Sequence, residues 1–474
     1  MSFSHPKVAV LNSVESFKDP RPSIKKRVAD GRALRKKLPL AEQGVYTPPK
    51  NRMSPVEVLE QQAKSRIASL IPIRYERMLQ SPFAFYRGGA AIMAQDLANQ
   101  PTTNITVQLC GDMHVSNFGL FGTAEHRLVF GINDFDETLP GSWEWDIKRL
   151  VSSAVIACES MGGDEILSKK LVHRITSEYQ KRMAQYAQMP YLDLAQQFIG
   201  EKDIRKFFSK SHQQKLDAYL KETKGQGNIQ VLEKLTTLVG KNRKIINRPP
   251  LIEHFSKNTY GQSLKHLINK ALLNYSSTLL ADRQVLFERY YLKDFARKVV
   301  GVGSVGTNCM VLYFEGDSEN DPLFMQYKEA QKSVLTPYLG DSLYPNMGHR
   351  VVAGQRLLQG APDIFLNYGA VGNTQDFYLR QLRDMKGGIA LGPGEVSLQN
   401  FPDYAKLFGW ALALGHARSG DAAMIAGYCG GSKELDKALY AFAKAYAKQN
   451  KADYALFCEA VKSGKLKAAK KKTL

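Results

Sequence analysis

Cysteine is scarce in this chain of 474 residues, which has only five, without a Cys-x-x-Cys pair. This argues against a disulfide framework and against a zinc site. Long apolar runs are also missing, since none approaches the roughly 20 residues that span a bilayer. The first residues lack the charged-then-apolar order of a signal peptide. We therefore expect a cytoplasmic protein without a membrane span.

Acidic residues are outnumbered, because 65 Lys and Arg stand against 45 Asp and Glu and give a net charge of +20. Basic clusters near both ends favour the interpretation that tails and solvated helix faces carry this excess. The second interpretation is an anionic partner, such as nucleotide phosphates, an acidic substrate or nucleic acid. Nucleic acid is the less favoured partner, because no groove-reading motif is present.

The most informative part of the sequence is a pair of polar stretches, residues 110–119 and 132–137. Each follows an apolar, β-prone run, so we expect their carboxylates at the ends of neighbouring strands. Carboxylates that lie side by side repel one another unless a divalent cation or a proton-transfer step uses them. The pattern therefore predicts a functional cluster, which consists of Asp112, Asn117, Asp134 and Asp136.

The spacing of these residues is typical of a phosphotransferase. An Asp, an Asn five positions later, a hairpin and then Asp-Phe form the layout of a kinase catalytic loop and its metal-binding Asp. The order Gly-Asp-x-His-x-x-Asn resembles the aminoglycoside and choline kinase branch of the kinase-like fold. Residues 139–150, with a Gly/Pro turn and an aromatic-Asp-apolar step, fit the same branch.

The resemblance implies a role for each residue. Asp112 would be the base that accepts the proton of the acceptor hydroxyl, and Asn117 and Asp134 would hold Mg²⁺. Asp146 would brace the loop from the start of the next helix. Two interpretations stay open for Asp136, a second metal ligand or a helix-capping residue. His114 corresponds to a mostly structural position, with catalysis as the less favoured alternative.

A second motif is glycine-rich and lies at residues 301–306, with Gly301, Gly303, Ser304 and Gly306. A strand follows it, so the dinucleotide-binding interpretation fails, since that motif requires a helix. Strand, glycine-rich turn, strand and a third strand with a lysine form the phosphate-covering flap of kinases. Lys328 would then neutralise nucleotide phosphates. The alternative is an ordinary hairpin with a surface lysine.

Several further residues support the site or weaken the analogy with kinases. A kinase usually pairs this lysine with a Glu on the following helix, where the chain offers Gln355 and no Glu. Three arginines are candidates to clamp phosphates or an acidic substrate, or to pair with the acidic cluster. They are Arg87, Arg380 and Arg383.

The order of the two motifs predicts the architecture. In kinases the glycine-rich flap precedes the catalytic loop, whereas here it follows by almost two hundred residues. We therefore expect an α+β, two-lobed, protein-kinase-like fold that is circularly permuted, with a small antiparallel β-sheet lobe and a larger helical lobe. The expected parts are a basic, loosely ordered arm (1–53), a helical lobe with the catalytic loop at 105–149 (54–296), a β-rich nucleotide-binding lobe (297–390), and C-terminal helices with a basic tail that complete the helical lobe (391–474).

A family resemblance covers most of the chain. It is carried by the two polar stretches and by residues 31–37, 81–88, 326–330, 380–387 and 416–421. On these segments the chain is identified as a member of the bacterial domain-of-unknown-function family 2252. That family name implies no reaction, so the function has to come from the residues.

Three classes of function follow from these motifs. The favoured one is an ATP- and Mg²⁺-dependent phosphotransferase that acts on a hydroxyl of an unknown small molecule or protein. Nucleotidyl transfer and a nucleotide-binding pseudoenzyme remain alternatives to it. A metal-dependent phosphoesterase is less favoured, because the Asp-x-His pair at residues 112–114 lacks the downstream His-containing box of that class.

Overall fold

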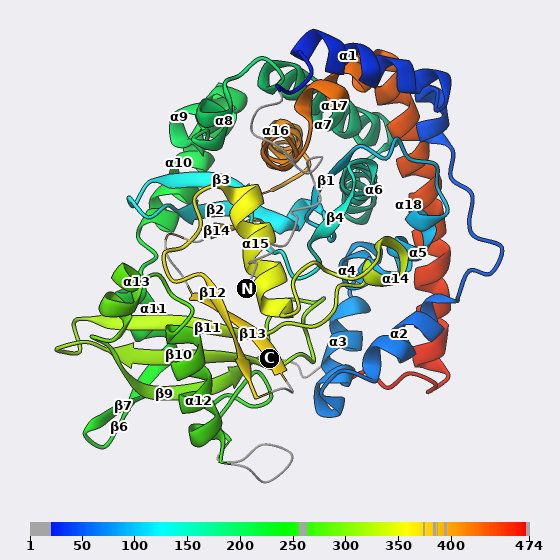
Figure 1. Ribbon diagram of the computed structural model, residues 1–474. Helices are drawn as coiled ribbons and strands as arrows, with labels where there is room; N and C mark the ends of the chain where they lie inside the picture. Colours follow the sequence, from blue (N-terminus) through cyan, green and yellow to red (C-terminus); the bar gives the residue numbers. More distant parts are fainter. Residues whose placement is uncertain are drawn as a thin grey trace.

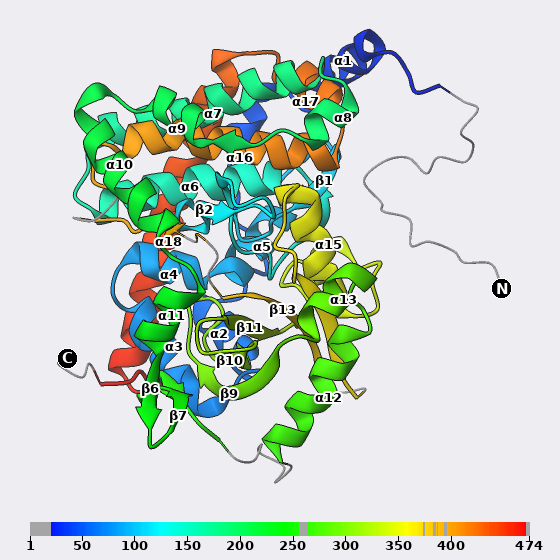
Figure 2. The same cartoon turned by 90° about the vertical axis from the view of Figure 1, so that its left-hand side faces the viewer.

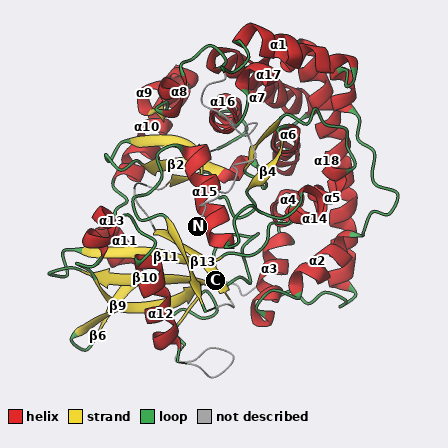
Figure 3. Cartoon of the chain, in the orientation of Figure 1, coloured by secondary structure: helices red, strands yellow, loops and turns green. Residues whose placement is uncertain are grey.

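The computed structural model describes residues 20–255, 263–372, 375–382, 385, 387–392 and 396–470. The protein is α+β, and its strands pair antiparallel within four sheets. A helix-rich part packs beside a sheet-rich part (Figures 1 and 3). Among the helices of these described ranges, none has the length and apolar character needed to cross a membrane.

The helix-rich part is assembled from both ends of the chain. Figure 1 shows the blue N-terminal helices beside the orange and red C-terminal ones, and the largest hydrophobic core includes residues of both. The N-terminal helices are α1 (Ile24–Ala33), α2 (Pro55–Ala63), α3 (Ile71–Met78), α4 (Pro82–Gly88), α5 (Ala90–Ala98), α6 (Glu144–Ser160), α7 (Glu165–Tyr186), α8 (Tyr191–Ala195), α9 (Glu201–Phe207) and α10 (Lys210–Lys224). The C-terminal helices are α16 (Phe401–Ser419), α17 (Ala422–Cys429) and α18 (Lys433–Lys462).

Two small sheets lie within the helix-rich part and carry the first polar stretch. One pairs β1 (Thr106–Leu109) with β4 (Leu139–Ser142). The other has the order β14-β2-β3-β5, formed by β14 (Gly387–Gly388), β2 (Phe118–Gly122), β3 (Leu128–Ile132) and β5 (Ile199–Gly200). The polar stretch therefore joins a strand of one sheet to a strand of the other.

The sheet-rich part is built on a six-stranded sheet of order β12-β13-β11-β10-β9-β8. In Figure 2 this sheet lies below the layer of α6, α7 and α16. Its strands are β8 (Ile252–Glu253), β9 (Tyr291–Lys298), β10 (Cys309–Glu315), β11 (Pro322–Glu329), β12 (Asn367–Val371) and β13 (Gln375–Gln381). The surrounding elements are α11 (Asn228–Leu235), the hairpin of β6 (Thr236–Val239) and β7 (Asn242–Ile245), α12 (Leu264–Ser276), α13 (Ala281–Phe287) and α15 (Met347–Gln359). The short helix α14 (Thr336–Leu339) packs against β4 and α5 of the helix-rich part.

Alternating side chains give this sheet two different faces. Met310, Leu312 and Phe314 of β10 join a core with residues of α12 and α13. Val311 and Tyr313 of the same strand join a second core with residues of α11 and β7. The structure thus differs from the expected boundary at residue 297, because elements from about residue 228 onward already pack on this sheet.

The N-terminal arm also differs from the expectation. Residues 1–19 lie outside the described ranges, but α1 packs against α17, where Arg27 pairs with Asp421 at 2.7 Å. Arg35 donates from Nε to the backbone oxygen of Tyr428 at 2.7 Å. Because this segment lacks hydrophobic periodicity, its sequence did not predict an ordered helix. Polar contacts to a distant part of the chain hold this helix in place.

Local sequence patterns also predict a capping box at residues 54–57, a hairpin over residues 363–382, one helix from residue 82 to 97 and one helix over residues 349–361. The capping box of Ser54 and Glu57 begins α2, and the hairpin of β12 and β13 lies where its strands were expected. The single helix expected from residue 82 to 97 is divided into α4 and α5, which meet at Gly89. The helix predicted for residues 349–361 is α15.

We predict that Arg52 holds the N-terminal segment to the helical core. Its guanidinium contacts Asp96 at 2.6 Å and Asp453 at 2.6 Å, and both carboxylates are almost fully buried. Arg52→Ala should lower the free energy of unfolding by about 3–5 kcal/mol, because it leaves two buried carboxylates without their cation. Urea denaturation measures this change. Lys26→Ala, which breaks an exposed pair on α1, should change it by less than about 1 kcal/mol; similar losses for both would contradict the prediction.

Candidate functional site

The turn after β1 is held by the first turn of α6. Asp146 accepts hydrogen bonds from the backbone amides of Cys110 at 2.7 Å and Gly111 at 3.0 Å. Gly111 has φ +84°, and a Cβ atom there would lie 2.3 Å from the backbone oxygen of Glu137, so only glycine fits. Asp146 therefore fixes the backbone immediately before Asp112, as expected from the sequence.

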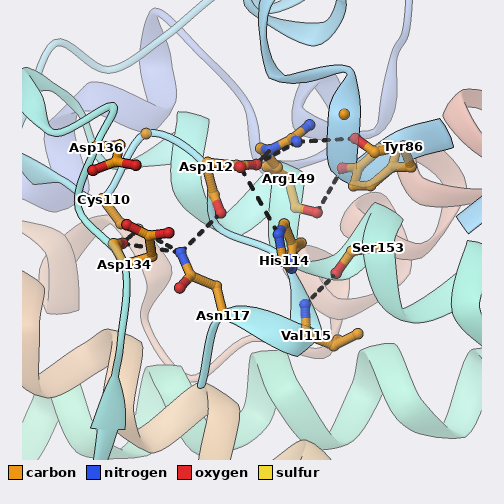
Figure 4. A network of polar contacts seen from close by, with 12 residues as sticks. Tyr86, Cys110, Asp112, His114, Val115, Asn117, Asp134, Asp136, Arg149 and Ser153 are labelled. Carbon is orange, nitrogen blue, oxygen red and sulfur yellow. Dashed lines mark hydrogen bonds and ion pairs between the residues drawn. The ribbon is translucent and has the colours of Figure 1, made fainter. Parts of the chain in front are cut away.

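One face of α6 supports the whole stretch. Asp146, Arg149 and Ser153 are three and four positions apart and so lie on the same face of the helix. Ser153 accepts a hydrogen bond from the backbone amide of Val115 at 3.1 Å. Figure 4 shows Arg149 and Ser153 projecting toward the stretch at two successive points.

Asp112 is held by a buried arginine. Arg149 Nε donates to Asp112 Oδ1 at 2.9 Å, and a terminal nitrogen of the same guanidinium contacts the same oxygen. Arg149 is buried beneath the ring of Tyr86, with 4.4 Å between its Cζ atom and the ring centroid. The Asp112 carboxylate therefore has one oxygen engaged by a fixed cation, and its side chain remains 22% exposed.

Asn117 connects the two polar stretches through its side-chain nitrogen. Its Nδ2 donates to the backbone oxygens of Asp112 at 3.2 Å and Asp134 at 3.0 Å (Figure 4). These bonds orient the amide group. They also keep its oxygen, the atom that could coordinate a cation, from pointing at those two carbonyl groups.

Lys328 reaches the second polar stretch from the sheet-rich part. Its Nζ lies 2.5 Å from Asp136 Oδ2 and 3.4 Å from Asp134 Oδ1. The hydroxyl of Tyr378 donates to the other oxygen of Asp136 at 2.6 Å. Burial alone would lower the pKa of Lys328, but the two carboxylates outweigh it and raise that pKa well above its ordinary value. The lysine is therefore charged.

The pairing register of the sheet explains how these side chains meet. Lys328 of β11 stands opposite Tyr378 of β13, and Gln326 stands opposite Arg380. All four project from the face opposite to the core of α12 and α13, since the intervening residues belong to that core. This face turns toward the polar stretches of the helix-rich part.

The glycine-rich loop at residues 301–306 is anchored to the helices α2 and α3 and the turn between them. The guanidinium groups of Arg66 and Arg77 donate to the backbone oxygens of Val305 and Gly301. The Ile67 amide donates to the Gly306 oxygen at 2.7 Å. Val302 packs into a hydrophobic core that includes α2, α3 and α18.

A single cavity of about 560 Å³ is lined by both motifs. Its wall contains the loop residues Gly301, Gly303 and Ser304, and the polar residues Asp112, His114, Asn117, Asp134 and Asp136. A Cβ atom on Gly303 would lie 3.9 Å from Asp112 Oδ2, which measures how closely the two motifs approach. Lys328 lies just behind this wall, with its side chain only 2% exposed, and contacts two carboxylates that line it.

The oxygen ligands available here fit a magnesium ion that shares its ligands with phosphates. Among the described residues, no three His, Cys, Asp or Glu side chains are grouped so that they could hold a metal ion. A phosphate-bound Mg²⁺ needs only one or two protein carboxylates. Asp134, with its side chain 44% exposed, and the side-chain oxygen of Asn117 are suitable. Asp136 fits this task less well, because Lys328 and Tyr378 engage both of its oxygens.

His114 is placed as a buried, neutral residue. Burial lowers its pKa to about 3, although the nearby Asp112 opposes this shift. Its Nε2 lies 3.8 Å from Asp112 Oδ2, which is too far for a hydrogen bond, and its ring packs edge-on against Phe83. This geometry agrees with the structural interpretation of His114.

The remaining predicted residues have different positions. Gln355 donates to Gln359 at 2.8 Å on α15, and among the described residues it forms no hydrogen bond with Lys328. Arg380 lines the cavity, donates to Gln326 and to the backbone oxygen of Asn133, and so is fixed within the protein. Arg87 lines the cavity from the last turn of α4. Arg383 lies outside the described residues.

Two residues of this site were missed in the sequence. Arg149 follows Asp146 by three positions on a helix, and that spacing was the signal that both would face the same loop. Tyr378 precedes Arg380 by two positions on a strand and so shares its face. Neither signal identifies the partner, because the contacts of both residues involve distant segments.

We predict that His114 makes stability depend on pH. Its folded-state pKa lies below its ordinary value, so the unfolded chain binds the proton more tightly. This stabilising contribution is therefore complete above about pH 6.5 and is lost progressively as the pH falls toward 3. The slope approaches about 1.4 kcal/mol per pH unit within that window.

Urea denaturation of the wild type and of His114→Gln at about pH 7.5 and pH 5 checks this. The difference in unfolding free energy between the two proteins should shrink at the lower pH, since glutamine does not titrate. A difference that stays constant between the two pH values would contradict the buried, neutral state of His114.

Comparison with known proteins shows only which family the chain belongs to. No curated protein and no solved structure matches the chain. The family described as uncharacterized protein conserved in bacteria (DUF2252) matches residues 66–460. Because this match covers most of the 474 residues, the chain belongs to the DUF2252 family.

Proposed function

We propose that this protein is an ATP- and Mg²⁺-dependent phosphotransferase that transfers a phosphoryl group to a hydroxyl. The observation that supports it most is the cavity lined at once by the glycine-rich loop and by Asp112, Asn117 and Asp134. Its volume of about 560 Å³ lies within the range of small-molecule sites. A glycine-rich loop next to oxygen ligands and a lysine is the set of groups that a triphosphate with its cation requires.

The order of elements supports a kinase-like, circularly permuted fold. From β9 the chain runs through the glycine-rich loop, β10, β11 with Lys328, and then α15, as in the nucleotide-binding lobe of kinases. The helix α16 follows in sequence but packs against β1, where Ser419 accepts a hydrogen bond from the backbone amide of Gln108. A circular permutation that places the two chain ends between the helices α16–α18 and the polar stretch would account for the reversed order of the motifs.

Each part of the cavity would contribute to positioning and charge neutralisation. The loop amides would face phosphate oxygens, and Lys328 would turn from Asp134 toward them while Asp136 holds it. Asn117 and Asp134 would hold Mg²⁺, which supplies charge neutralisation on the phosphates when bound. Asp112 would accept a hydrogen bond from the acceptor hydroxyl and orient it.

Asp136 would replace the glutamate that kinases place on the helix after the lysine strand. It lies two residues after Asp134 and contacts Lys328 at 2.5 Å, while Tyr378 fixes its second oxygen. The lysine would thus be oriented from the helix-rich part, and Gln355 would have no part in it. This explains why the expected helix can lack a Glu.

A second candidate is a nucleotide-binding protein that does not transfer a phosphoryl group. The ion pair between Arg149 and Asp112 favours it, because the arginine already occupies one oxygen of the carboxylate that would have to accept a hydrogen bond from the acceptor hydroxyl. Phosphoryl transfer through a loose transition state needs little proton abstraction, so the same pair is compatible with an orienting role. A turnover measurement separates the two candidates.

We predict that Mg²⁺ with ATP raises the unfolding temperature of the protein, and that Asp134→Ala abolishes the part of this shift that depends on Mg²⁺. The reason is that Asp134 is the exposed carboxylate next to the loop. Thermal unfolding with ATP, with and without Mg²⁺, measures the shift. Asp282→Ala removes a carboxylate of α13 and should behave like the wild type; an equal loss in both variants would count against the site.

We further predict that Asp112→Asn retains Mg²⁺–ATP binding and loses ATP turnover by about a hundredfold or more. Asparagine keeps an oxygen for Arg149, so the loop should stay in place. Release of ADP measures phosphoryl transfer, whereas release of pyrophosphate would identify nucleotidyl transfer. Binding without turnover in the wild type, across a metabolite extract, would favour the non-catalytic candidate.

A further inference from the structure

The cations that line the cavity differ in whether they already have partners. Four Lys or Arg side chains contribute to its wall. Lys332 pairs with Asp341 at 2.8 Å, and Arg66 and Arg380 donate to backbone oxygens. Arg87 makes no hydrogen bond and no ion pair with any residue in the described part of the chain, and its Nε atom is fully buried. The Nε atom of Arg66 is also buried without a partner, but a terminal nitrogen of that guanidinium is bonded to Val305. Arg87 therefore differs from the other three wall cations in that its whole guanidinium makes no bond within the described part of the chain.

The position of Arg87 is fixed although its guanidinium is not. It belongs to the last turn of α4, whose side chains Phe83, Phe85 and Tyr86 are buried in the surrounding cores. A Cβ atom on Gly303 would lie 3.6 Å from the backbone oxygen of Arg87 and 3.9 Å from Asp112 Oδ2. The arginine thus lies at the end of the cavity where the loop approaches Asp112.

The charge at this end of the cavity is not balanced. Among the carboxylates, Asp112 has the largest electrostatic effect on Arg87. However, Asp112 already forms an ion pair with Arg149. Burial lowers the pKa of Arg87, an effect that Asp112 only partly offsets. A guanidinium group stays protonated under such conditions. One positive charge with unpaired N–H donors therefore remains beside Asp112.

Lys328 and Arg87 serve different ends of the cavity. The carboxylates that act on Lys328 are Asp134 and Asp136, whereas Asp112 acts first on Arg87 and Asp134 more weakly. In the structure, Lys328 contacts Asp134 and Asp136, whereas the backbone of Arg87 lies where the glycine-rich loop approaches Asp112. An anion bound at Arg87 would be separate from phosphate groups neutralised by Lys328.

We propose that Arg87 is a specificity-determining residue that binds a phosphate-type anion next to Asp112. A donor that is buried without a partner, like the Nε of Arg87, is costly, and the planar fork of guanidinium donors matches the oxygens of a phosphate. The anion is either the terminal phosphate of the nucleotide or a phosphate carried by the acceptor. Only the second identification rests on the proposed function, because anion binding itself does not require catalysis.

Calorimetric titration of the full chain with inorganic phosphate, Mg²⁺–ADP and Mg²⁺–ATP tests this proposal. Arg87→Ala should weaken binding of phosphate by about tenfold or more, and Arg87→Lys should weaken it less, because it keeps the charge but loses the fork. The control Lys332→Ala removes a cation from the same wall that already has a partner, and should change binding by less than about threefold.

The same titrations distinguish the two sources of the anion. If Arg87 binds the terminal phosphate of the nucleotide, Arg87→Ala weakens Mg²⁺–ATP and leaves Mg²⁺–ADP unchanged. If it binds a phosphate of the acceptor, both nucleotides bind as in the wild type, and phosphate added with saturating Mg²⁺–ADP binds more weakly. Either result supports the proposal.

Two results would overturn it, namely an Arg87→Ala variant that binds all three probes like the wild type, or a wild type that binds none of them. The variant should unfold at the wild-type temperature or slightly above it, since no bond is lost, so weaker binding would not reflect misfolding.

Phosphate binding that depends on Arg87 without any nucleotide binding would contradict the proposed function and leave this inference intact. Nucleotide binding by the wild type, together with binding of phosphate and of both nucleotides that is unchanged in Arg87→Ala, would support the proposed function and contradict this inference.

Discussion

The contact of Lys328 with Asp134 and Asp136 joins the two parts of the molecule at the wall of the cavity that both motifs line. The lysine comes from β11 and the carboxylates from the turn after β3, so the cluster forms only when the sheet-rich part docks on the helix-rich part. A buried ion pair of this kind adds little net stability, because desolvation offsets most of the attraction. Its presence is better explained by the need to hold a cation where a ligand can meet it.

The face of α6 that supports Asp112 also holds groups of the cavity in fixed positions. Asp146, Arg149 and Ser153 fix the polar stretch at three points; the bonds of Asp146 and Ser153 are buried, and that of Arg149 is partly buried. The carboxylate end of the cavity is therefore rigid before any ligand binds. Rigidity of this kind reduces the entropy lost on binding and keeps reacting groups in register.

The sequence was sufficient to predict the features that depend on neighbouring residues. Strand ends with polar residues, the capping box of α2 and the hairpin of β12 and β13 all follow from local patterns. It was insufficient to predict contacts between a residue and a distant segment of the chain. The pairing of Asp136 with Lys328, of Arg149 with Asp112, and of α1 with α17 joins residues that a single sequence does not relate. The start of the sheet-rich part was misplaced for the same reason, since α11–α13 read as helices whichever part they pack on.

The anchoring of the glycine-rich loop shows why the cavity is a property of the whole chain. Val302 is inserted among residues of α2, α3 and α18, and the backbone oxygens of Gly301 and Val305 are bonded by Arg77 and Arg66. The glycines give the loop a backbone that can pass close to a ligand, but these contacts remove much of its freedom. The N-terminal helices therefore set the distance between the loop and Asp112. Since α18 packs against α2, this C-terminal helix also supports the cavity, although none of its residues lines the wall.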